Sequence, residues 1–136
     1  MSDAPRQVGI ALITDGPRVL VTQRRADDSF AGYWEFPGGT CESSETLEQC
    51  VVREMQEELG VAVTVEGRGP DVVHRYPDWT IHLVSFWCRL AGGTPTPIEA
   101  ADCRWVTAPE LPGYQFPPAS GPLIAAVAAR LQGAAR

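Results

Sequence analysis

The segment from Glu35 to Val61, EFPGGTCESSETLEQCVVREMQEELGV, carries seven acidic side chains and one basic side chain. From Glu45 onward its apolar residues recur at helical spacing, with Ser44 as the expected N-cap and Gly60 as the residue that stops the helix. Like charges three or four residues apart destabilise an isolated helix. A chain that folds with this segment therefore needs something that offsets the repulsion.

The acids are not placed where an ordinary solvated helix would have them. At roughly 100° per residue, Glu54 and Glu58 fall beside Leu47, inside or at the edge of the apolar arc, and Glu57 falls next to Cys50. Clustered carboxylates raise one another's pKa, and a hard divalent cation relieves this because it prefers carboxylate oxygens. The placement favours a metal site, and the alternative is a charged helix balanced by Arg53 alone.

The loop before the helix is consistent with a phosphate ligand. Gly38 and Gly39 allow the backbone to approach a cation closely, and the N-terminus of the following helix attracts anions. Glycines, carboxylates and a helix end together predict a site for a metal-bound diphosphate.

The rest of the chain predicts strands and one further helix. Asp15-Gly16-Pro17 is a hairpin signal, and Pro37 with two glycines argues against a regular element in EFPGG. The predicted strands cover 8–14, 19–25, 61–67 and 103–107, two more flank a turn at Pro77-Asp78 within 71–90, and a closing helix covers 120–132. We expect one α/β domain over residues 1–136.

Charge and hydropathy restrict the partners. The formal net charge of −6 argues against binding of nucleic acid polymers or anionic membranes. No run reaches the roughly 18 apolar residues of a membrane span, and the first residues lack the layout of a secretory signal. We therefore expect a cytoplasmic protein with a small-molecule substrate, monomeric or dimeric.

The four cysteines show no metal-binding or redox motif. Cys41, Cys50, Cys88 and Cys103 contain no CxxC pair and have no histidine at zinc-finger spacing. In a cytoplasmic protein this predicts reduced, partly buried thiols.

Gly39, Glu45 and the run REMQEELGV over 53–61 resemble a complete Nudix box, covering residues 39–61. TQRR, WEFPGG, YPDWTIHL and FPPASGPLIAAVAARL extend the similarity to the mutator-T (MutT) type of Nudix hydrolase over most of the chain. The resemblance implies the Nudix fold, an α/β/α sandwich with a mixed β-sheet.

The resemblance also implies an activity. Such enzymes use Mg²⁺, or Mn²⁺, to hydrolyse a nucleoside triphosphate to the monophosphate and pyrophosphate, and the type member removes 8-oxo-dGTP from the nucleotide pool. We expect a sanitiser of 8-oxo-dGTP or related modified purine nucleotides. Two alternatives are a pyrophosphohydrolase for CTP, dCTP or methylated dCTP, and a nucleotide-sensing module without catalysis, which the intact box disfavours.

Roles for individual residues follow from the resemblance. The implied catalytic residues are Glu54, Glu57 and Arg53. The implied metal ligands are Gly38, Glu54, Glu57, Glu58 and Glu99. The implied substrate contacts are Arg24, Glu35, Phe36, Tyr76, Asp78 and Ser120. The residues with structural roles in the motif are Gly39, Glu45 and Gly60.

Four of these positions also have a simpler interpretation. Phe36 and Tyr76 could be core aromatics, Arg24 a surface residue of a strand, and Glu99 a solvated acid on a loop.

Two positions depart from the family pattern. Ser120 stands where the type enzyme has Asn for base recognition, and a hydroxyl lacks the paired donor and acceptor of an amide. Thr40 stands where the family often has Lys, so a phosphate-facing cation is absent there or is supplied by Arg24 or Arg25.

Overall fold

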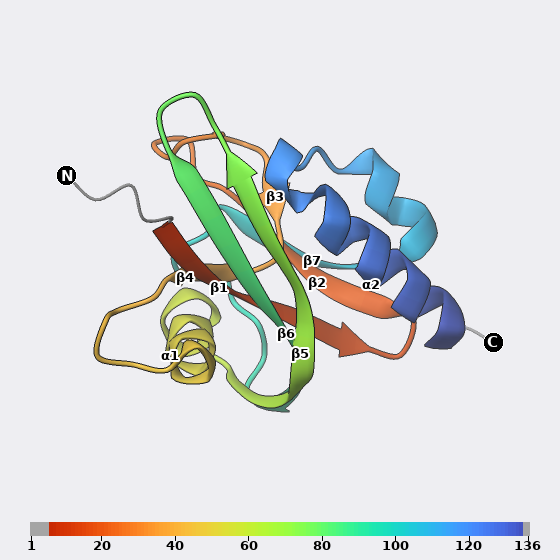
Figure 1. Ribbon diagram of the computed structural model, residues 1–136. Coiled ribbons are helices and arrows are strands. Elements are labelled where there is room, and N and C mark those ends of the chain that lie inside the picture. The colour runs from red at the N-terminus through yellow and green to blue at the C-terminus, as the bar shows by residue number, and fades with distance from the viewer. Residues whose placement is uncertain (1–5, 135–136) are drawn as a thin grey trace.

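The computed structural model describes residues 6–134, drawn in Figure 1. Seven strands and two α-helices follow one another in the order β1 (Arg6–Asp15), β2 (Arg18–Gln23), β3 (Trp34–Glu35), β4 (Gly38–Thr40), α1 (Leu47–Leu59), β5 (Ala62–Arg75), β6 (Thr80–Gly92), β7 (Asp102–Thr107) and α2 (Gly121–Ala134). Two short 3-10 helices, η1 (Ala108–Gly113) and η2 (Pro118–Ser120), precede α2.

The strands form a mixed sheet in the order β3-β2-β1-β6-β5, with β4 paired to β1 and β7 paired to β2. β1 and β6 run parallel, with Val8 opposite Leu83, and the other pairs are antiparallel. The expected mixed sheet of an α/β fold is therefore confirmed.

β1 packs against both helices because successive side chains of a strand point to opposite faces. Ile10 and Leu12 lie in the core cluster that contains Leu123 and Val127 of α2. Ala11 and Ile13 lie in the cluster that contains Met55 of α1. Figure 1 shows α1 and α2 on opposite sides of the strands. This is the α/β/α layering that the resemblance implied.

The start of α1 differs from the prediction, which placed Ser44 at the N-cap and the helix from Glu45. Thr46 is the N-cap, and its hydroxyl accepts a hydrogen bond from the Gln49 backbone N–H at 3.1 Å. The Gln49 side chain accepts in return from the Thr46 N–H at 2.9 Å, which completes a capping box that Ser44 could not form. Gly60 ends the helix in the left-handed conformation, as predicted.

The EFPGG segment also differs from the prediction of no regular element. Its glycines form part of β4, in which Gly39 pairs with Gly9 and Gly38 with Ile10. A Cβ on Gly38 would overlap the Gly9 carbonyl. Glycine is thus what allows this short strand to pair closely with β1.

The two strands predicted over 61–67 and before Pro77 are one continuous strand, β5, whose pairing with β6 contains three register shifts. The shifts explain why the alternation in the sequence is interrupted near Gly67. No helix within residues 6–134 is long and apolar enough to cross a membrane.

Cys41 and Cys50 form a disulfide across a sequence separation of nine, with Cα atoms 5.3 Å apart. The prediction of four reduced thiols is therefore wrong for this pair, while Cys88 and Cys103 are free. The sequence could not indicate the bond because it depends on how the end of β4 packs on the first turn of α1.

Candidate functional site

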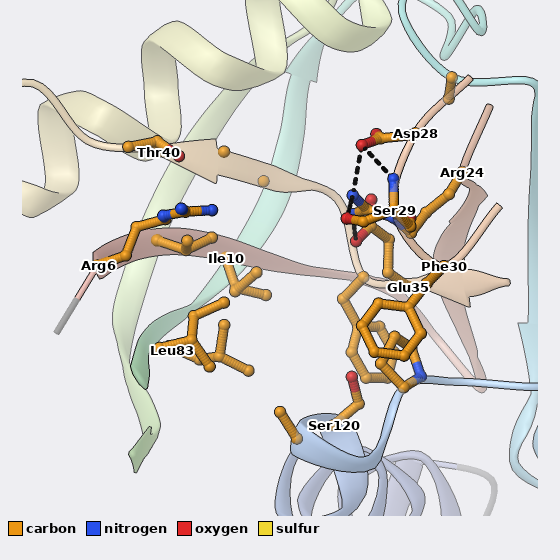
Figure 2. A pocket seen from close by; sticks show the side chains of 18 of the residues that line it. Arg6, Ile10, Arg24, Asp28, Ser29, Phe30, Glu35, Thr40, Leu83 and Ser120 are labelled. Carbon is orange, nitrogen blue, oxygen red and sulfur yellow. Dashed lines mark hydrogen bonds and ion pairs between the residues drawn. The ribbon is translucent and has the colours of Figure 1, made fainter. Parts of the chain in front are cut away.

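A cavity of about 400 Å³ opens beside β1 and β4. One wall comes from alternate residues of β1, since Arg6, Val8 and Ile10 face the same side of the sheet. The acids of α1 line one region, and Phe36 with Ser120 line another. Figure 2 shows Arg6 and Thr40 toward one end of the cavity and Ser120 with Phe30 toward the other.

Five carboxylates line the cavity: Asp28 from the segment between β2 and β3, Glu35 from β3, Glu54 and Glu58 from α1, and Glu99 from the loop before β7. Burial is the main reason that the pKa of Glu35 and that of Glu54 are raised, and the Arg partner of each opposes the rise. This concentration of acids makes the wall favourable for a cation.

Glu58 is the most strongly perturbed of these acids. Its side chain is buried, with a residue exposure of 7%. Burial raises the pKa of Glu58 to about 8, with further contributions from the negative charges of Glu35 and Glu54. Within residues 6–134 no Lys, Arg or His forms an ion pair with it. The Gly38 backbone hydrogen bond opposes the rise in the pKa of Glu58 only in part, and a buried carboxyl without a cationic partner is suited to a positively charged ligand.

Glu99 reaches the cavity because its loop is attached to the end of α1. The backbone N–H of Ile98 and that of Glu99 donate to the Glu58 carbonyl oxygen at 3.0 and 3.3 Å. The Thr96 N–H donates to the Leu59 carbonyl at 3.0 Å. These bonds use carbonyls that a helix end leaves free, and they fix a loop residue beside the helical acids.

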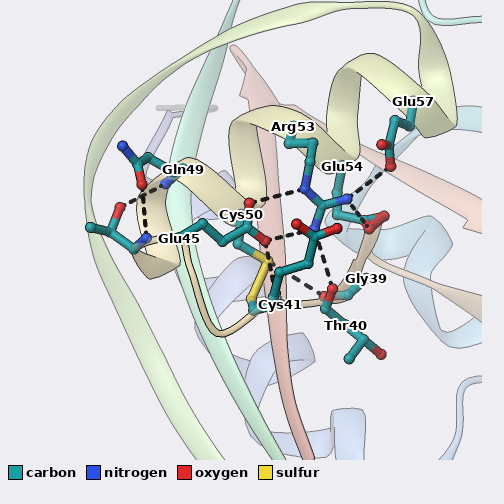
Figure 3. A network of polar contacts seen from close by, with 11 residues as sticks. Gly39, Thr40, Cys41, Glu45, Gln49, Cys50, Arg53, Glu54 and Glu57 are labelled. Carbon is teal, nitrogen blue, oxygen red and sulfur yellow. Dashed lines mark hydrogen bonds and ion pairs between the residues drawn. A yellow bond between two sulfur atoms is a disulfide. The ribbon is translucent and has the colours of Figure 1, made fainter.

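Arg53 connects the loop and the helix, as Figure 3 shows. Its guanidinium donates to both carboxylate oxygens of Glu45, at 2.6 and 3.0 Å, and to the Thr40 carbonyl at 3.3 Å. It also donates to Glu54 at 3.1 Å and to Glu57 at 2.9 Å. The hydrogen bonds from Arg53 and from the Glu42 backbone lower the pKa of Glu45 to about 2. Glu45 and Arg53 therefore connect the segment between β4 and α1 to the acids of α1.

Glu57 lies apart from the cavity. It does not line the wall that Glu54 and Glu58 form, and its side chain is 48% exposed and paired with Arg53. The three box acids thus occupy different environments. Glu58 is buried, Glu54 is at the wall, and Glu57 is at the surface.

Arg24 and Glu35 form an ion pair at 2.8 Å at the edge of the cavity. Arg24 also pairs with Asp28 at 2.9 Å and donates to the Ser29 carbonyl at 2.6 Å, and Figure 2 shows this cluster. Arg25 pairs with Asp27 at 3.5 Å. Both arginines that the sequence offered as phosphate partners are thus engaged by carboxylates.

Aromatic residues surround the other part of the cavity. Phe36 is buried against Phe116, with ring centroids 5.1 Å apart, and Tyr76 stacks on Trp79 at 4.6 Å. Phe36 is both a core residue and a cavity residue, so its two interpretations are compatible. Ser120 is buried at the end of η2 and lines the cavity. Asp78 is exposed and does not line it.

Sequence reasoning missed two residues of the cavity, Arg6 and Phe30. The Arg6 guanidinium lies over the Trp79 ring, 5.0 Å from its centroid, and the rings of Phe30 and Tyr76 have centroids 5.7 Å apart. Phe30 has a φ of +51°, which is uncommon for a large side chain. The spacing of Arg6, Val8 and Ile10 at every second position of a strand could have indicated that Arg6 lines the cavity. The segment between β2 and β3 has no hydrophobic period, so the sequence gave no signal for Phe30.

The donor set at the acidic wall fits a hard divalent cation. It consists of carboxylate oxygens with a glycine backbone beside them, which are the ligands that Mg²⁺ and Mn²⁺ take. The buried Glu58, which has no cationic partner among the described residues, is the observation that supports this fit.

Comparison with known proteins gives consistent matches. The NUDIX domain model matches residues 3–127. The 8-oxo-dGTP diphosphatase of Escherichia coli K12 is 34% identical over 120 residues, covering 88% of this chain and 93% of that protein. The CTP pyrophosphohydrolase of the same organism is 33% identical over 120 residues, covering 88% and 89%.

A solved structure supports the same grouping. The solution structure of MutT from methicillin-resistant Staphylococcus aureus superposes with a TM-score of 0.77 and 27% identity, covering 95% of this chain and 99% of that one.

Proposed function

The chain belongs to the Nudix hydrolase family and is a MutT-like hydrolase of pyrophosphate bonds in small nucleotide substrates, and we propose that it cleaves modified purine deoxynucleoside triphosphates such as 8-oxo-dGTP. The products are the monophosphate and pyrophosphate. One observation carries the proposal: a single cavity joins Glu54 and the buried Glu58 of α1 to an aromatic pocket beside Ser120.

Nudix hydrolases need a divalent metal, and we propose Mg²⁺, with Mn²⁺ as a substitute. Glu54, Glu57, Glu58, Glu99 and the Gly38 carbonyl would hold it. A bound cation of this kind neutralises phosphate charge and lowers the pKa of water.

The residues of the chain supply the remaining chemistry. Glu54 lines the cavity and is the acid that we assign to accept the proton of the attacking water, since a raised pKa favours a general base near neutral pH. Arg53 orients Glu54 and keeps the loop against α1. Water adds to the β-phosphorus, and the bond to the α-phosphate oxygen breaks.

The other end of the cavity would hold the nucleoside. Phe36 and Tyr76 offer aromatic surfaces, and the Arg24–Glu35 pair provides polar groups for the ribose or base. Because Ser120 stands in place of an Asn amide, this pocket would bind a purine edge more weakly than a pocket with Asn at that position. The similarity to the CTP pyrophosphohydrolase makes CTP or dCTP the second candidate.

The test compares kcat/KM for 8-oxo-dGTP, dGTP, dCTP and CTP with Mg²⁺. A preference for 8-oxo-dGTP over dGTP is expected, while a preference for dCTP or CTP would establish the second candidate. A flat profile would contradict a sanitising role. Hydrolysis in ¹⁸O-labelled water locates the attack, because addition at the β-phosphorus leaves the label in pyrophosphate.

A further inference from the structure

Cys41 and Cys50 lie within the segment that builds the acidic wall. Cys41 follows β4 directly, two residues after Gly39, and Cys50 is on α1, three residues before Arg53. The disulfide therefore links the residue after β4 to α1, the helix that carries Glu54, Glu57 and Glu58. Figure 3 shows the bond beside the Glu45–Arg53 network.

The sulfur atoms occupy a space that the rest of the fold leaves for them. A Cβ on Gly9 of β1 would lie 3.0 Å from the Cys50 Sγ and 3.1 Å from the Cys41 Sγ. Cys50 is fully buried, whereas Cys41 is partly exposed. The Cys50 Sγ also lies 3.7 Å from the Gly39 carbonyl oxygen. The pair is thus bounded on the β1 side, and Cys41 is the more exposed of the two residues.

We propose that the Cys41–Cys50 pair is a reversible redox site that controls how firmly the acidic wall is held for its metal. When the bond is broken, the two sulfurs must separate to van der Waals contact. Gly9 and the buried position of Cys50 block movement toward the core, so Cys41 moves outward. Its neighbours Gly39, which lies against Glu54, and Glu45, which holds Arg53, are displaced with it.

The chemistry balances with a dithiol as reductant and a hydroperoxide as oxidant. A thiolate of the dithiol attacks the accessible Cys41 sulfur, and Cys50 leaves as a thiolate. The second thiol of the reductant then releases Cys41, so two electrons and two protons pass to the pair and the dithiol becomes a disulfide. In the other direction a hydroperoxide oxidises one thiolate to a sulfenic acid, which condenses with the second thiol and releases water.

Only the consequence for hydrolysis rests on the proposed function. Oxidants that modify purine bases would also form the Cys41–Cys50 disulfide. The oxidised form, which binds the metal more tightly, would therefore accumulate under the conditions that generate the proposed substrate.

The experiment uses the full chain in two forms, one treated with a dithiol and one with hydrogen peroxide, each then freed of reagent. Alkylation and mass spectrometry verify the thiol count. Mn²⁺ binding is measured without nucleotide, from the electron paramagnetic resonance signal of free Mn²⁺. The oxidised form should bind Mn²⁺ roughly tenfold more tightly than the reduced form. A loss of this size is typical when residues that orient the metal ligands are displaced.

Variants separate this site from other effects. Cys41→Ser with Cys50→Ser should bind Mn²⁺ like the reduced form and should not respond to the dithiol. Cys103→Ser is the matched control and should keep the full response. If the double variant does not fold, Cys41→Ser alone, at the partly exposed position, removes the same bond.

Equal Mn²⁺ affinity in both forms, or failure of the pair to oxidise, overturns the proposal whether or not triphosphates are hydrolysed. A tenfold change in a protein that hydrolyses no triphosphate supports the redox site and contradicts the proposed function. The two inferences therefore fail separately.

Discussion

Gly39 of β4 lies directly against the Glu54 carboxylate of α1, at a separation that leaves no room for a Cβ atom. Gly39→Ala would therefore displace either the Glu54 side chain or the β4 backbone. Since a misplacement of about 1 Å can cost 100-fold in rate, we expect kcat/KM to fall by about two orders of magnitude. Steady-state kinetics test this. Gly133→Ala, at an exposed position of α2 with open space around it, should retain activity, and full activity of Gly39→Ala would contradict the assignment of Glu54.

The raised pKa of Glu58 predicts an unusual pH dependence of stability in the metal-free protein. Between its ordinary value near 4.5 and about 8, the folded state holds a proton that the unfolded state releases. The free energy of unfolding should therefore fall as pH rises through this window, by at most about 1.4 kcal/mol per pH unit, and level off above it.

Urea unfolding at a series of pH values, with a chelator present, measures this slope. Glu58→Gln should remove it, because an amide does not titrate, and the difference between the two proteins isolates Glu58 from the other acids. The same slope in both proteins would mean that Glu58 ionises normally.

Glu57 is the box acid that lies outside the cavity, where it is exposed and paired with Arg53. If it holds the metal, Glu57→Gln should raise the Mg²⁺ requirement and lower turnover by roughly 10- to 100-fold. Glu48→Gln, on the first turn of the same helix, is the control. Near-normal turnover at saturating Mg²⁺ would remove Glu57 from the metal set.

Ser120 is expected to weaken base selection. Ser120→Asn restores an amide that can donate and accept together, a contact worth about 1–3 kcal/mol. The ratio of kcat/KM for 8-oxo-dGTP to that for dCTP should rise by roughly 5- to 150-fold. Ser120→Ala controls for loss of the hydroxyl alone. An unchanged ratio in the Asn variant would place base recognition elsewhere in the cavity.

Arg6 is the cavity arginine available for phosphate. Arg24 and Arg25 are paired with carboxylates, whereas no acid within residues 6–134 forms an ion pair with Arg6. We expect Arg6→Gln to weaken inhibition by pyrophosphate about tenfold, the loss typical of one charge-assisted hydrogen bond, and to leave inhibition by the monophosphate unchanged. Arg89→Gln, on the exposed part of β6, is the control. Equal loss for both inhibitors would indicate a general charge effect.

The features that the sequence predicted correctly depend on local signals. The first hairpin follows from Asp15-Gly16-Pro17, and the end of α1 follows from Gly60. The position of Glu54 and Glu58 at the edge of the core followed from their angle to the apolar face of the helix. These signals involve neighbours within one or two turns of the chain, and tertiary packing did not alter them.

The features that it missed depend on contacts between distant segments. β4 exists because β1 offers Gly9 as a partner, and Phe30 reaches the cavity only through its packing on Tyr76. The N-cap at Thr46 was missed because the choice among Ser44, Glu45 and Thr46 depends on which side chain can pair with Gln49.

The Cys41–Cys50 bond also has a practical meaning for anyone who handles this protein. Material purified in a thiol-containing buffer and material purified without one differ by two hydrogen atoms and by one covalent cross-link. A mixed preparation contains two species of almost identical mass and charge, and a binding curve measured on it reports their average. Samples should therefore be defined by their thiol content before any two measurements are compared.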